Sequence, residues 1–322
     1  MLRILRSAAR APRDWARQRH NSVTPLHEIA GRRSRDVGES QAVPTPEATQ
    51  MPFLEEARQL RCSSYRLPAP SISTLQDVAY SGRYQILLTG SRSVIAESVS
   101  SACTPETFGV VGLHRGTLER IEGACTTIRS HRNEFYHTLI DNLPRLWVLH
   151  LAGAEDAGPV RMLLSSPLTA AEGYFLDRLL PEHVELEFLD PTRSYSVEKF
   201  ILPSFLSRRF SGCLPTAYLD WFLPRVLPNR PRQSNRRILI SRRPTSRGRI
   251  RCILNEDELF AALEPHGFER LALEDLSMAE QIDLFYDADV VIGAHGAGLT
   301  NLLFAQGAKV LELFPQDNVV PH

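Results

Sequence analysis

The sequence predicts an α/β protein whose C-terminal part is an open parallel sheet with helices on both faces. From residue 236 onward, short β-branched runs alternate with segments of helical spacing in the order βαβαβαβ. A glycine-rich turn at 293–298 joins one of these runs to the helical segment that follows it. Because crossovers between parallel strands are right-handed, this order puts helices on both faces and ligands at the carboxyl ends of the strands.

Each element of this part has its own local signal. The first helix begins at Asn255, with Glu258 as its capping-box acid, and ends before Gly267. The second begins in the same way at Ser277, with Glu280 three residues later. The expected strands are 236–241, 268–273, 290–292 and 309–314, and a third helix starts at 299.

The first half of the chain is less regular. Residues 21–55 are rich in Pro, Ser, Thr, Arg and Glu and hold few large apolar side chains, so structure should begin near residue 60. A strand-like piece follows at 84–88. Segment 133–151 has helical spacing, within which Pro144 should kink or restart the helix.

Strand-like runs and a helical stretch then alternate, which indicates βαβ units. The runs are 161–166, 184–189 and 199–204, and the helical stretch is 171–180. Residues 223–235 hold three prolines and no apolar period, and they predict a linker. The expected organisation is a basic segment of low order (1–58), an N-terminal α/β domain on the acceptor side (59–225) and a C-terminal Rossmann-like domain that binds the ligand (226–322).

Composition narrows the classes of function. Lys+Arg and Asp+Glu both number 37, so the total charge predicts no nucleic-acid partner. The five cysteines include no Cys-x-x-Cys pair, which fits a reducing compartment and indicates neither a disulfide framework nor a zinc site. No run reaches the ~18 apolar residues of a membrane span. The arginine-rich residues 1–34 predict a disordered terminus, with a peripheral membrane contact or a transit-like leader as alternatives.

The glycine-rich turn predicts an anion site. Free backbone N–H groups at a helix start favour phosphate, and the glycines allow it to approach closely. His295 and Asn301 are positioned to add donors from the side. A tight strand-to-helix turn without a ligand is the alternative.

Two further groups carry candidate chemistry. Arg242 and Arg243, directly after strand 236–241, and Arg247 in the same loop would form a clamp for a diphosphate, unless the loop is merely a solvated basic one. His137 and Asp141 are four residues apart on a predicted helix and share one face. The carboxylate would orient the imidazole, or either group would act as a base; a surface or capping contact is the alternative.

Three acidic residues complete the candidates. Glu312 lies near the tip of the last strand, where its carboxylate would take ribose hydroxyls or simply face water. Asp287 and Asp289 resemble a metal-binding Asp-x-Asp pair, but they precede a buried strand at a helix end. We interpret them as a solvated turn and expect no metal.

Several strings, in this order over roughly residues 130–315, resemble glycosyltransferase family 61. They are NEFYHTLIDNLPRL at 133–146, ISRR at 240–243, NEDEL at 255–259, GF at 267–268, EQI at 280–282, VIGAHGAGLTN at 291–301 and GAKVLEL at 307–313. Their combination in one order is far more specific than any single motif.

The resemblance implies a GT-B fold, with two Rossmann-like domains facing a cleft. It also implies the transfer of a hexosyl or pentosyl group from a nucleotide sugar, with inversion. The expected donor is a UDP-sugar, and the expected reaction requires neither a metal nor another cofactor. The acceptor would be a glycan or a glycolipid in polysaccharide biosynthesis. Because the sequence shows no luminal anchor and no cysteine framework, we expect the bacterial type, in the cytoplasm or associated with the membrane. Family members usually continue past the last strand, so we expect the C-terminal domain to be incomplete at His322.

Matching positions carry the family's site residues onto this chain. The residues expected around the donor diphosphate are Arg242, Arg247, His295, Gly296, Ala297, Gly298 and Asn301. His137 and Asp141 would face the cleft from the other domain, one of them as the base on the acceptor hydroxyl. The arginines and the glycine turn would stabilise the charge of the leaving diphosphate. The loop at 247–254 is longer than the family's pattern, so the resemblance leaves open which arginine meets the phosphate.

Two other functions stay open. A relative that binds nucleotide sugars or glycans without turnover would keep the fold and lose catalysis through C-terminal truncation. A Rossmann-type NAD(P) enzyme fits less well, because the glycine turn comes late and no acidic residue follows it at the distance that would hold a ribose.

Overall fold

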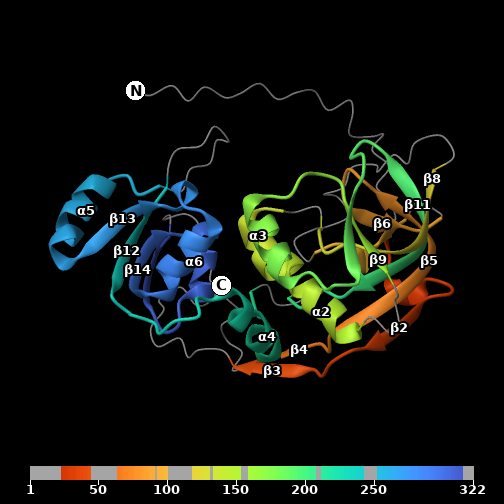
Figure 1. Cartoon of the computed structure of the whole chain (residues 1–322), viewed down its shortest axis with the longest axis horizontal. Helices are drawn as coiled ribbons and strands as arrows, with labels where there is room; N and C mark the ends of the chain where they lie inside the picture. The colour runs from red at the N-terminus through yellow and green to blue at the C-terminus, as the bar shows by residue number, and fades with distance from the viewer. Residues whose placement is uncertain are drawn as a thin grey trace, which may run out of the picture.

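The protein is a mixed α/β structure built on two main sheets (Figure 1). The computed structural model describes residues 23–44, 64–90, 93–100, 118–130, 133–153, 159–207, 212–242 and 252–314. We call the described part of 23–226 the N-terminal unit and that of 236–314 the C-terminal unit. Residues 1–22, Arg243 and Arg247, to which the sequence assigns a basic terminus and a phosphate clamp, lie outside the described residues.

The N-terminal unit contains a large mixed sheet and four helices. Its strands are β1 (Val23–Thr24), β2 (Arg33–Asp36), β3 (Gln41–Pro44), β4 (Ser64–Leu67), β5 (Ser71–Ser81), β6 (Ile86–Leu88), β7 (Val94–Ile95), β8 (Glu119–Thr126), β9 (Val160–Leu164), β10 (Val184–Phe188) and β11 (Ser194–Pro203). Its helices are α1 (Phe135–His137), α2 (Pro144–Ala152), α3 (Ala170–Leu179) and α4 (Thr216–Val226), with a π-helical turn at Thr138–Asn142.

In the described residues the main sheet has the strand order β1-β7-β6-β5-β11-β8-β9-β10, and β2 also pairs with β5. The unit β9-α3-β10 is parallel, as the alternation of strand and helix predicts. Strand β11 differs from that prediction. It lies between β5 and β8, antiparallel to β5 over most of its length and parallel to β8. The sheet is therefore mixed and not purely parallel.

Part of the segment expected to have low order is paired in the structure. Strand β2 is exposed at all four residues, yet it pairs antiparallel with β5, and β3 pairs with β4. Backbone hydrogen bonds hold such strands at a sheet edge without an alternating apolar pattern, so a search for apolar periodicity does not find them.

The helical segment predicted at 133–151 is interrupted. The three residues of α1 lead directly into the π-helical turn, and α2 restarts with Pro144 in its first turn. Proline is favoured there because its missing N–H would have no intrahelical partner. The restart at Pro144 is confirmed, whereas the π-helical turn was not predicted.

The C-terminal unit is a parallel four-stranded sheet of order β13-β12-β14-β15 in the described residues. Its elements are β12 (Arg236–Ser241), α5 (Glu256–Leu263), β13 (Phe268–Ala272), α6 (Met278–Tyr286), β14 (Ala288–Ala294), a 3-10 helix (Ala297–Phe304) and β15 (Lys309–Leu313). The predicted strand and helix order is confirmed. Ser277 and Glu280 form both bonds of the predicted capping box, whereas the side chain of Asn255 makes no capping bond.

The helix after the glycine turn is 3-10 and not α. Leu299 N–H donates to the carbonyl of Gly296, three residues back, at 3.0 Å. The buried amide of Asn301 donates to the carbonyl of Gly298 at 3.1 Å. In an α-helix the carbonyl of Gly298 would accept the backbone N–H of Leu302, four residues later. Because the side chain of Asn301 binds this carbonyl instead, it favours the 3-10 helix.

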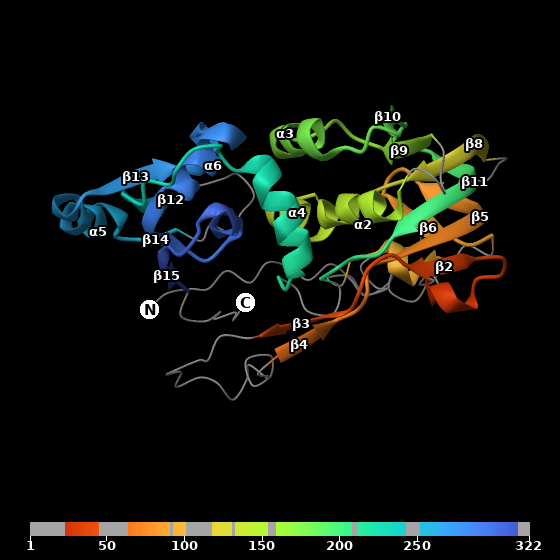
Figure 2. The same ribbon diagram turned by 60° about the horizontal axis from the view of Figure 1, so that its bottom comes forward.

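The two units pack against each other through one continuous apolar core. Phe304 of the C-terminal unit stacks on Phe175 of α3, with ring centroids 6.2 Å apart, and lies 6.3 Å from Phe222 of α4. Helices α2, α3 and α4 lie between the two sheets in both views (Figures 1 and 2). No helix in the described ranges is long and apolar enough to cross a membrane.

Candidate active site

The glycine turn follows β14 and is shaped by close packing. A Cβ on Gly293 would lie 3.2 Å from Cβ of Ile240, and one on Gly298 would lie 3.2 Å from Cδ1 of Leu273. Both glycines therefore let the turn approach neighbouring strands and loops more closely than a side chain would allow. The turn stands at the carboxyl edge of the parallel sheet, where open α/β sheets bind their ligands.

His295 is an internal brace of this turn. Its Nδ1 lies 2.6 Å from Oε1 of Glu312 on β15, and its ring stacks on Phe314 at 5.0 Å. Its backbone N–H donates to the carbonyl of Leu313 at 2.9 Å. The side chain of His295 is only 8% exposed, whereas that of Glu312 is 29% exposed. Glu312, expected at a ribose, is thus occupied with orienting the imidazole.

Arg242 lies directly against the turn. Its guanidinium donates to the carbonyl of His295 at 3.3 Å. A Cβ built on Gly296 would collide with Nη1 of Arg242 and lie 3.1 Å from its Cζ. The absence of a side chain at 296 therefore makes room for the arginine.

A pocket of about 490 Å³ opens between the two units at this point. From the C-terminal unit it is lined by Ile240, Ser241, Arg242, Leu273, Glu274, Leu276, Ser277, Met278, Gln281, Ala297, Gly298 and Asn301, and from the N-terminal unit by Asn133, Phe135, Thr169, Ala170 and Ala171. The starts of α3, α6 and the 3-10 helix all contribute to its wall. Helix starts carry free N–H groups and positive potential, so the pocket suits an anion.

Asn301 is fully buried and lines this pocket. Its amide N–H groups are already bound, to Gln281 Oε1 at 3.1 Å and to the carbonyl of Gly298. Its Oδ1 is buried without a hydrogen-bond partner among the described residues. Asn301 can therefore accept a hydrogen bond from a ligand through Oδ1, whereas the sequence predicts that its side chain donates one.

His137 and Asp141 form the expected pair, four residues apart across α1 and the π-helical turn. His137 Nδ1 lies 2.7 Å from Oδ2 of Asp141, and Ser207 Oγ donates to the other carboxylate oxygen at 2.7 Å. The side chain of Asp141 is 5% exposed and that of His137 is 14% exposed. Helix α1 packs against the 3-10 helix of the glycine turn, so the pair lies on an element next to the pocket.

The structure thus sorts the predicted site residues into groups. Arg242, Ala297, Gly298 and Asn301 line one pocket. Gly296, His295 and Glu312 support its wall from behind, while His137 and Asp141 stand on the neighbouring α1 segment. Their roles in binding and catalysis stay predictions.

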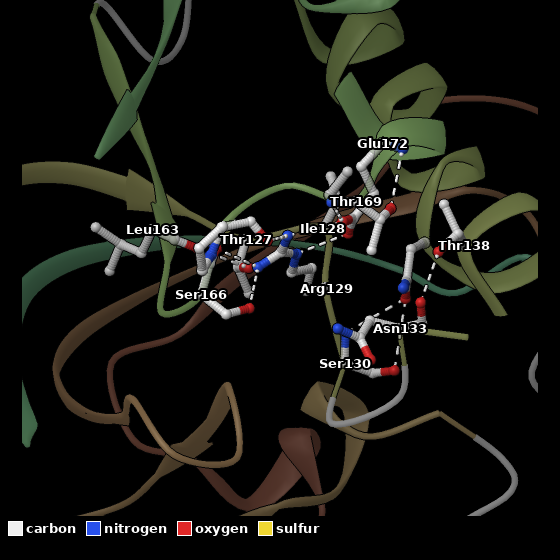
Figure 3. Close-up of polar contacts among 12 residues, drawn as sticks. Thr127, Ile128, Arg129, Ser130, Asn133, Thr138, Leu163, Ser166, Thr169 and Glu172 are labelled. Carbon is white, nitrogen blue, oxygen red and sulfur yellow. Dashed lines mark hydrogen bonds and ion pairs between the residues drawn. The ribbon is translucent and has the colours of Figure 1, made fainter. Parts of the chain in front are cut away.

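Sequence reasoning missed the residues that hold the opposite wall. The guanidinium of Arg129 is fully buried and binds both carboxylate oxygens of Glu172, at 2.7 and 2.8 Å, and the carbonyls of Ser166 and Pro167 (Figure 3). Glu172 also completes a capping box with Thr169 at the start of α3. The Thr-x-x-Glu spacing predicts the start of this helix. The sequence gives no comparable signal for the pairing of Glu172 with Arg129, which lies 43 residues away.

Arg145 is a second fully buried arginine. It donates to the carbonyls of Ile128, Arg129 and Pro203, at 3.0, 3.3 and 3.0 Å, and so ties the ends of β8 and β11 together. Its guanidinium also covers the ring of Phe205 at 4.3 Å. Burial lowers its pKa to about 9, still well above neutral pH, so the group stays charged. Through β11 it fixes the segment that carries Ser207.

Within the described residues, no group of three or more His, Cys, Asp or Glu side chains is arranged to hold a metal ion. Asp287, considered above with Asp289, accepts two hydrogen bonds from Arg230, at 3.1 and 2.8 Å, and one from the backbone N–H of Gln233. It anchors the linker between the units to the start of β14.

Comparison with known proteins gives a consistent family and several partial relatives. An EGF domain-specific O-linked N-acetylglucosamine transferase of Drosophila melanogaster is 38% identical over 103 residues, which are 30% of this chain and 19% of that protein. The Mus musculus protein of the same name is 34% identical over 116 residues, 32% of this chain and 21% of the relative.

A plant protein is similar as well. The Alpha-1,3-arabinosyltransferase XAT2 of Oryza sativa subsp. japonica is 30% identical over 142 residues, 41% of this chain and 22% of the relative. Each alignment covers about a fifth of the relative's own length.

The family assignment rests on a longer match. The sequence model described as Glycosyltransferase 61 matches residues 135–311, which is more than half of the 322 residues. This range begins at α1 with the His137–Asp141 pair and includes the glycine turn, most of β15 and the described pocket residues other than Asn133. The chain therefore belongs to the glycosyltransferase 61 family.

Proposed function

We propose that this chain transfers a sugar, with inversion, from a nucleotide-diphosphate sugar to a hydroxyl group of a glycan or lipid-linked glycan. In this proposal the two units act as the two Rossmann-like halves of a GT-B enzyme. The C-terminal unit holds the donor and the N-terminal unit faces the acceptor. The relatives named above transfer N-acetylglucosamine in one case and arabinose in the other, which supports glycosyl transfer in general and leaves hexosyl and pentosyl donors open.

The observation that carries the proposal is the pocket between the units. Arg242 reaches it from the end of β12, and the starts of three helices line it. A diphosphate there would meet free N–H groups, positive helix potential and one guanidinium. These groups also match what a transferase needs, because negative charge grows on the diphosphate as it leaves. We propose a UDP-sugar as donor and a reaction that requires no metal.

The buried oxygen of Asn301 supports a nucleotide ligand further. An acceptor without a partner in a closed site is costly, and a ligand O–H or N–H would satisfy it. Ribose hydroxyls and nucleobase N–H groups supply such donors, whereas a fully deprotonated anion such as sulfate does not.

We assign the base to His137 and its orientation to Asp141. Both oxygens of Asp141 are engaged, one by His137 and one by Ser207. A carboxylate that accepts from Nδ1–H leaves the lone pair on Nε2 of the imidazole, which can take the proton of an acceptor hydroxyl. His137 is also the more exposed of the two side chains.

A donor-hydrolysis assay tests the proposal. Purified protein is incubated with UDP-, GDP- and CMP-sugars, and released nucleotide is measured together with donor binding. We expect binding and slow release with a UDP-sugar, and the anomeric configuration of the product, read by proton NMR, inverted relative to the donor. Saturable binding without any release would instead favour a non-catalytic binding relative, and no binding to any donor would overturn both.

A further inference from the structure

A second pocket among the described residues lies away from the proposed donor site. It has a volume of about 620 Å³, within the range of small-molecule sites. Its lining includes residues of α3 and of the end of α4 from the N-terminal unit and of α6 from the C-terminal unit. Figures 1 and 2 show where these helices lie. It shares only Leu276 with the donor pocket. The donor pocket uses the start of α3, whereas this one uses Tyr174 and Arg178 further along the helix.

The floor of this pocket is apolar and includes both units. Val226 at the end of α4 and Ile282 of α6 are buried, and Leu227, Leu271 and Leu276 are partly buried. These residues form a surface that would gain by covering the apolar body of a ligand, at about 25 cal/mol per Å².

Two arginines at its edge are held in place by aromatic rings. The guanidinium carbon of Arg178 lies 3.7 Å from the ring centre of Tyr174, and its Nη1 donates to the carbonyl of the same tyrosine. Arg225 lies 5.0 Å from the ring centre of Trp221 and donates to its carbonyl at 2.6 Å. Such stacking fixes a guanidinium while leaving its remaining N–H groups available, so less entropy is lost on binding an anion.

The acidic side chains of the pocket are already engaged. Glu280 accepts the backbone N–H of Ser277 at 2.7 Å, and Asp283 accepts from Arg230 at 2.6 Å. Arg236, the third arginine of the lining, is bound at both ends to Glu269, at 2.6 and 2.8 Å. The lining holds three arginines and two carboxylates, so its net charge is positive.

Among the described residues, the acid paired with Arg178 is a weak partner. Asp177 lies 3.3 Å from Arg178, but its side chain is 79% exposed, where an ion pair contributes little. Arg225 has no acidic partner among the described residues.

We propose that this pocket binds an amphipathic anion, a small molecule whose phosphate, sulfate or carboxylate group meets Arg178 and Arg225 while its apolar body covers the floor. The ligand would touch α3 and α4 on one side and α6 on the other. Its binding would therefore hold the two units in the arrangement seen here. The proposal does not depend on transferase activity.

Isothermal titration of the whole chain with n-octyl phosphate, below its micellar concentration, tests this site. Octanoate, inorganic phosphate and octanol separate the contributions of head group and tail. We expect saturable binding of octyl phosphate or octanoate, and binding at least about tenfold weaker for inorganic phosphate and octanol. Equal affinity for inorganic phosphate, or no saturable binding of either amphiphile, would overturn the proposal.

Variants locate the binding. Arg178→Gln and Arg225→Gln should each weaken octyl phosphate binding about tenfold or more, because each removes a charge-assisted bond. The matched control is Arg193→Gln, an arginine that also covers a tyrosine ring but lies outside the pocket. Unchanged affinity in both test variants, or an equal loss in the control, would contradict the assignment.

A fourth variant tests whether the ligand occupies the apolar floor of the pocket, without changing Arg178 or Arg225. Ala279 is exposed on α6 and lines the pocket, so Ala279→Trp should fill the space with little loss of stability. We expect octyl phosphate binding to be lost while the melting temperature stays near that of the parent. UDP should not compete with octyl phosphate; competition would place the amphiphile in the donor pocket and refute the separate site.

Discussion

Each of the two units contains a histidine bound through Nδ1 to a carboxylate, but the pairs are arranged in opposite ways. In the N-terminal unit Asp141 is the inner group, and His137 is the more exposed one. In the C-terminal unit the imidazole of His295 is the inner group, and Glu312 is the more exposed one. The distances are nearly equal, 2.7 and 2.6 Å, so distance does not distinguish them.

The difference lies in what else each histidine contacts. His295 is stacked on Phe314, and its backbone bonds both β15 and Arg242, so it holds a turn in shape. His137 is held from behind by an acid that Ser207 fixes in turn. The same two functional groups therefore hold a turn in shape in one unit and form a proposed proton acceptor in the other, and both their order of burial and their other contacts distinguish the two pairs.

The largest expected effect tests the N-terminal pair. Asp141→Asn should lower turnover by about 10²–10⁴-fold, because an amide N–H facing Nδ1 favours the tautomer that has lost its lone pair on Nε2. Donor affinity should stay within about twofold, since the change removes no donor contact. Steady-state kinetics and donor titration measure the two effects.

His137→Ala should be as severe, and the double variant no worse than either single one, because the two residues act as one unit. Full transfer in Asp141→Asn would refute the assignment of roles, and a loss of donor binding equal to the loss of turnover would place the pair at the donor.

A smaller effect is expected at the C-terminal turn. Arg242→Ala should weaken donor binding about 10- to 150-fold, the equivalent of a charge-assisted hydrogen bond worth ~1.5–3 kcal/mol. Arg237→Ala, at the opposite end of the same strand, is the matched control and should leave donor affinity unchanged. Equal effects of the two variants would mean that general positive charge, and not the position of Arg242, determines binding.

Gly296→Ala tests the same contact without removing the arginine. The added Cβ would displace the end of a flexible side chain, so donor binding should weaken. The melting temperature should fall as well, because Gly296 has φ +157°, a backbone conformation that residues with a side chain rarely adopt. Gly293→Ala should lower the melting temperature without displacing Arg242, because its Cβ would press on the buried Ile240.

The brace formed by His295 should be less sensitive than the pair in the other unit. Glu312→Gln replaces a charged acceptor by a neutral one and should cost about 1 kcal/mol of unfolding free energy. Turnover at saturating donor should fall far less than in Asp141→Asn, because no proton transfer is assigned to His295. Chemical denaturation and kinetics on the same preparation provide both values. A loss of turnover as large as that of Asp141→Asn would remove the distinction between the two pairs.

The last prediction concerns stability alone, at a carboxylate that binds arginine instead of histidine. Hydrogen bonds from Arg230 lower the pKa of Asp287, so its stabilisation is complete above the unfolded-state pKa of about 3.9 and is lost as the pH falls through the lower folded-state pKa. Asp287→Asn should cost ~1–2 kcal/mol at pH 7 and clearly less near pH 2. Denaturant midpoints at the two pH values measure this; a cost that does not change with pH would contradict the linkage.

Sequence reasoning recovered the C-terminal unit better than the N-terminal one, for a physical reason. In the former, strand follows helix in a regular order, and signals such as Ser277 with Glu280 are local. In the latter, β11 pairs with β5, which precedes it by more than 100 residues, and no local pattern records that pairing.

The candidate site shows the same division. Spacing found His137 with Asp141, and the glycine motif indicated the turn that Arg242 contacts. The contacts of Ser207 with Asp141 and of Arg129 with Glu172 were not predicted, because the two residues are 66 apart along the chain in the first contact and 43 apart in the second. The reversed burial of the two histidine–carboxylate pairs also required the structure, because burial depends on the packing of both units.

The three carbonyls held by Arg145 have a consequence for how this region tolerates sequence change. Lysine carries a single ammonium group, which cannot reach the carbonyls of Ile128 and Arg129 after β8 and that of Pro203 on β11 together. A neutral residue would leave all three oxygens without this donor and away from water. In a saturation library scored for folded protein, position 145 should accept arginine alone, even though no substrate is expected to touch it.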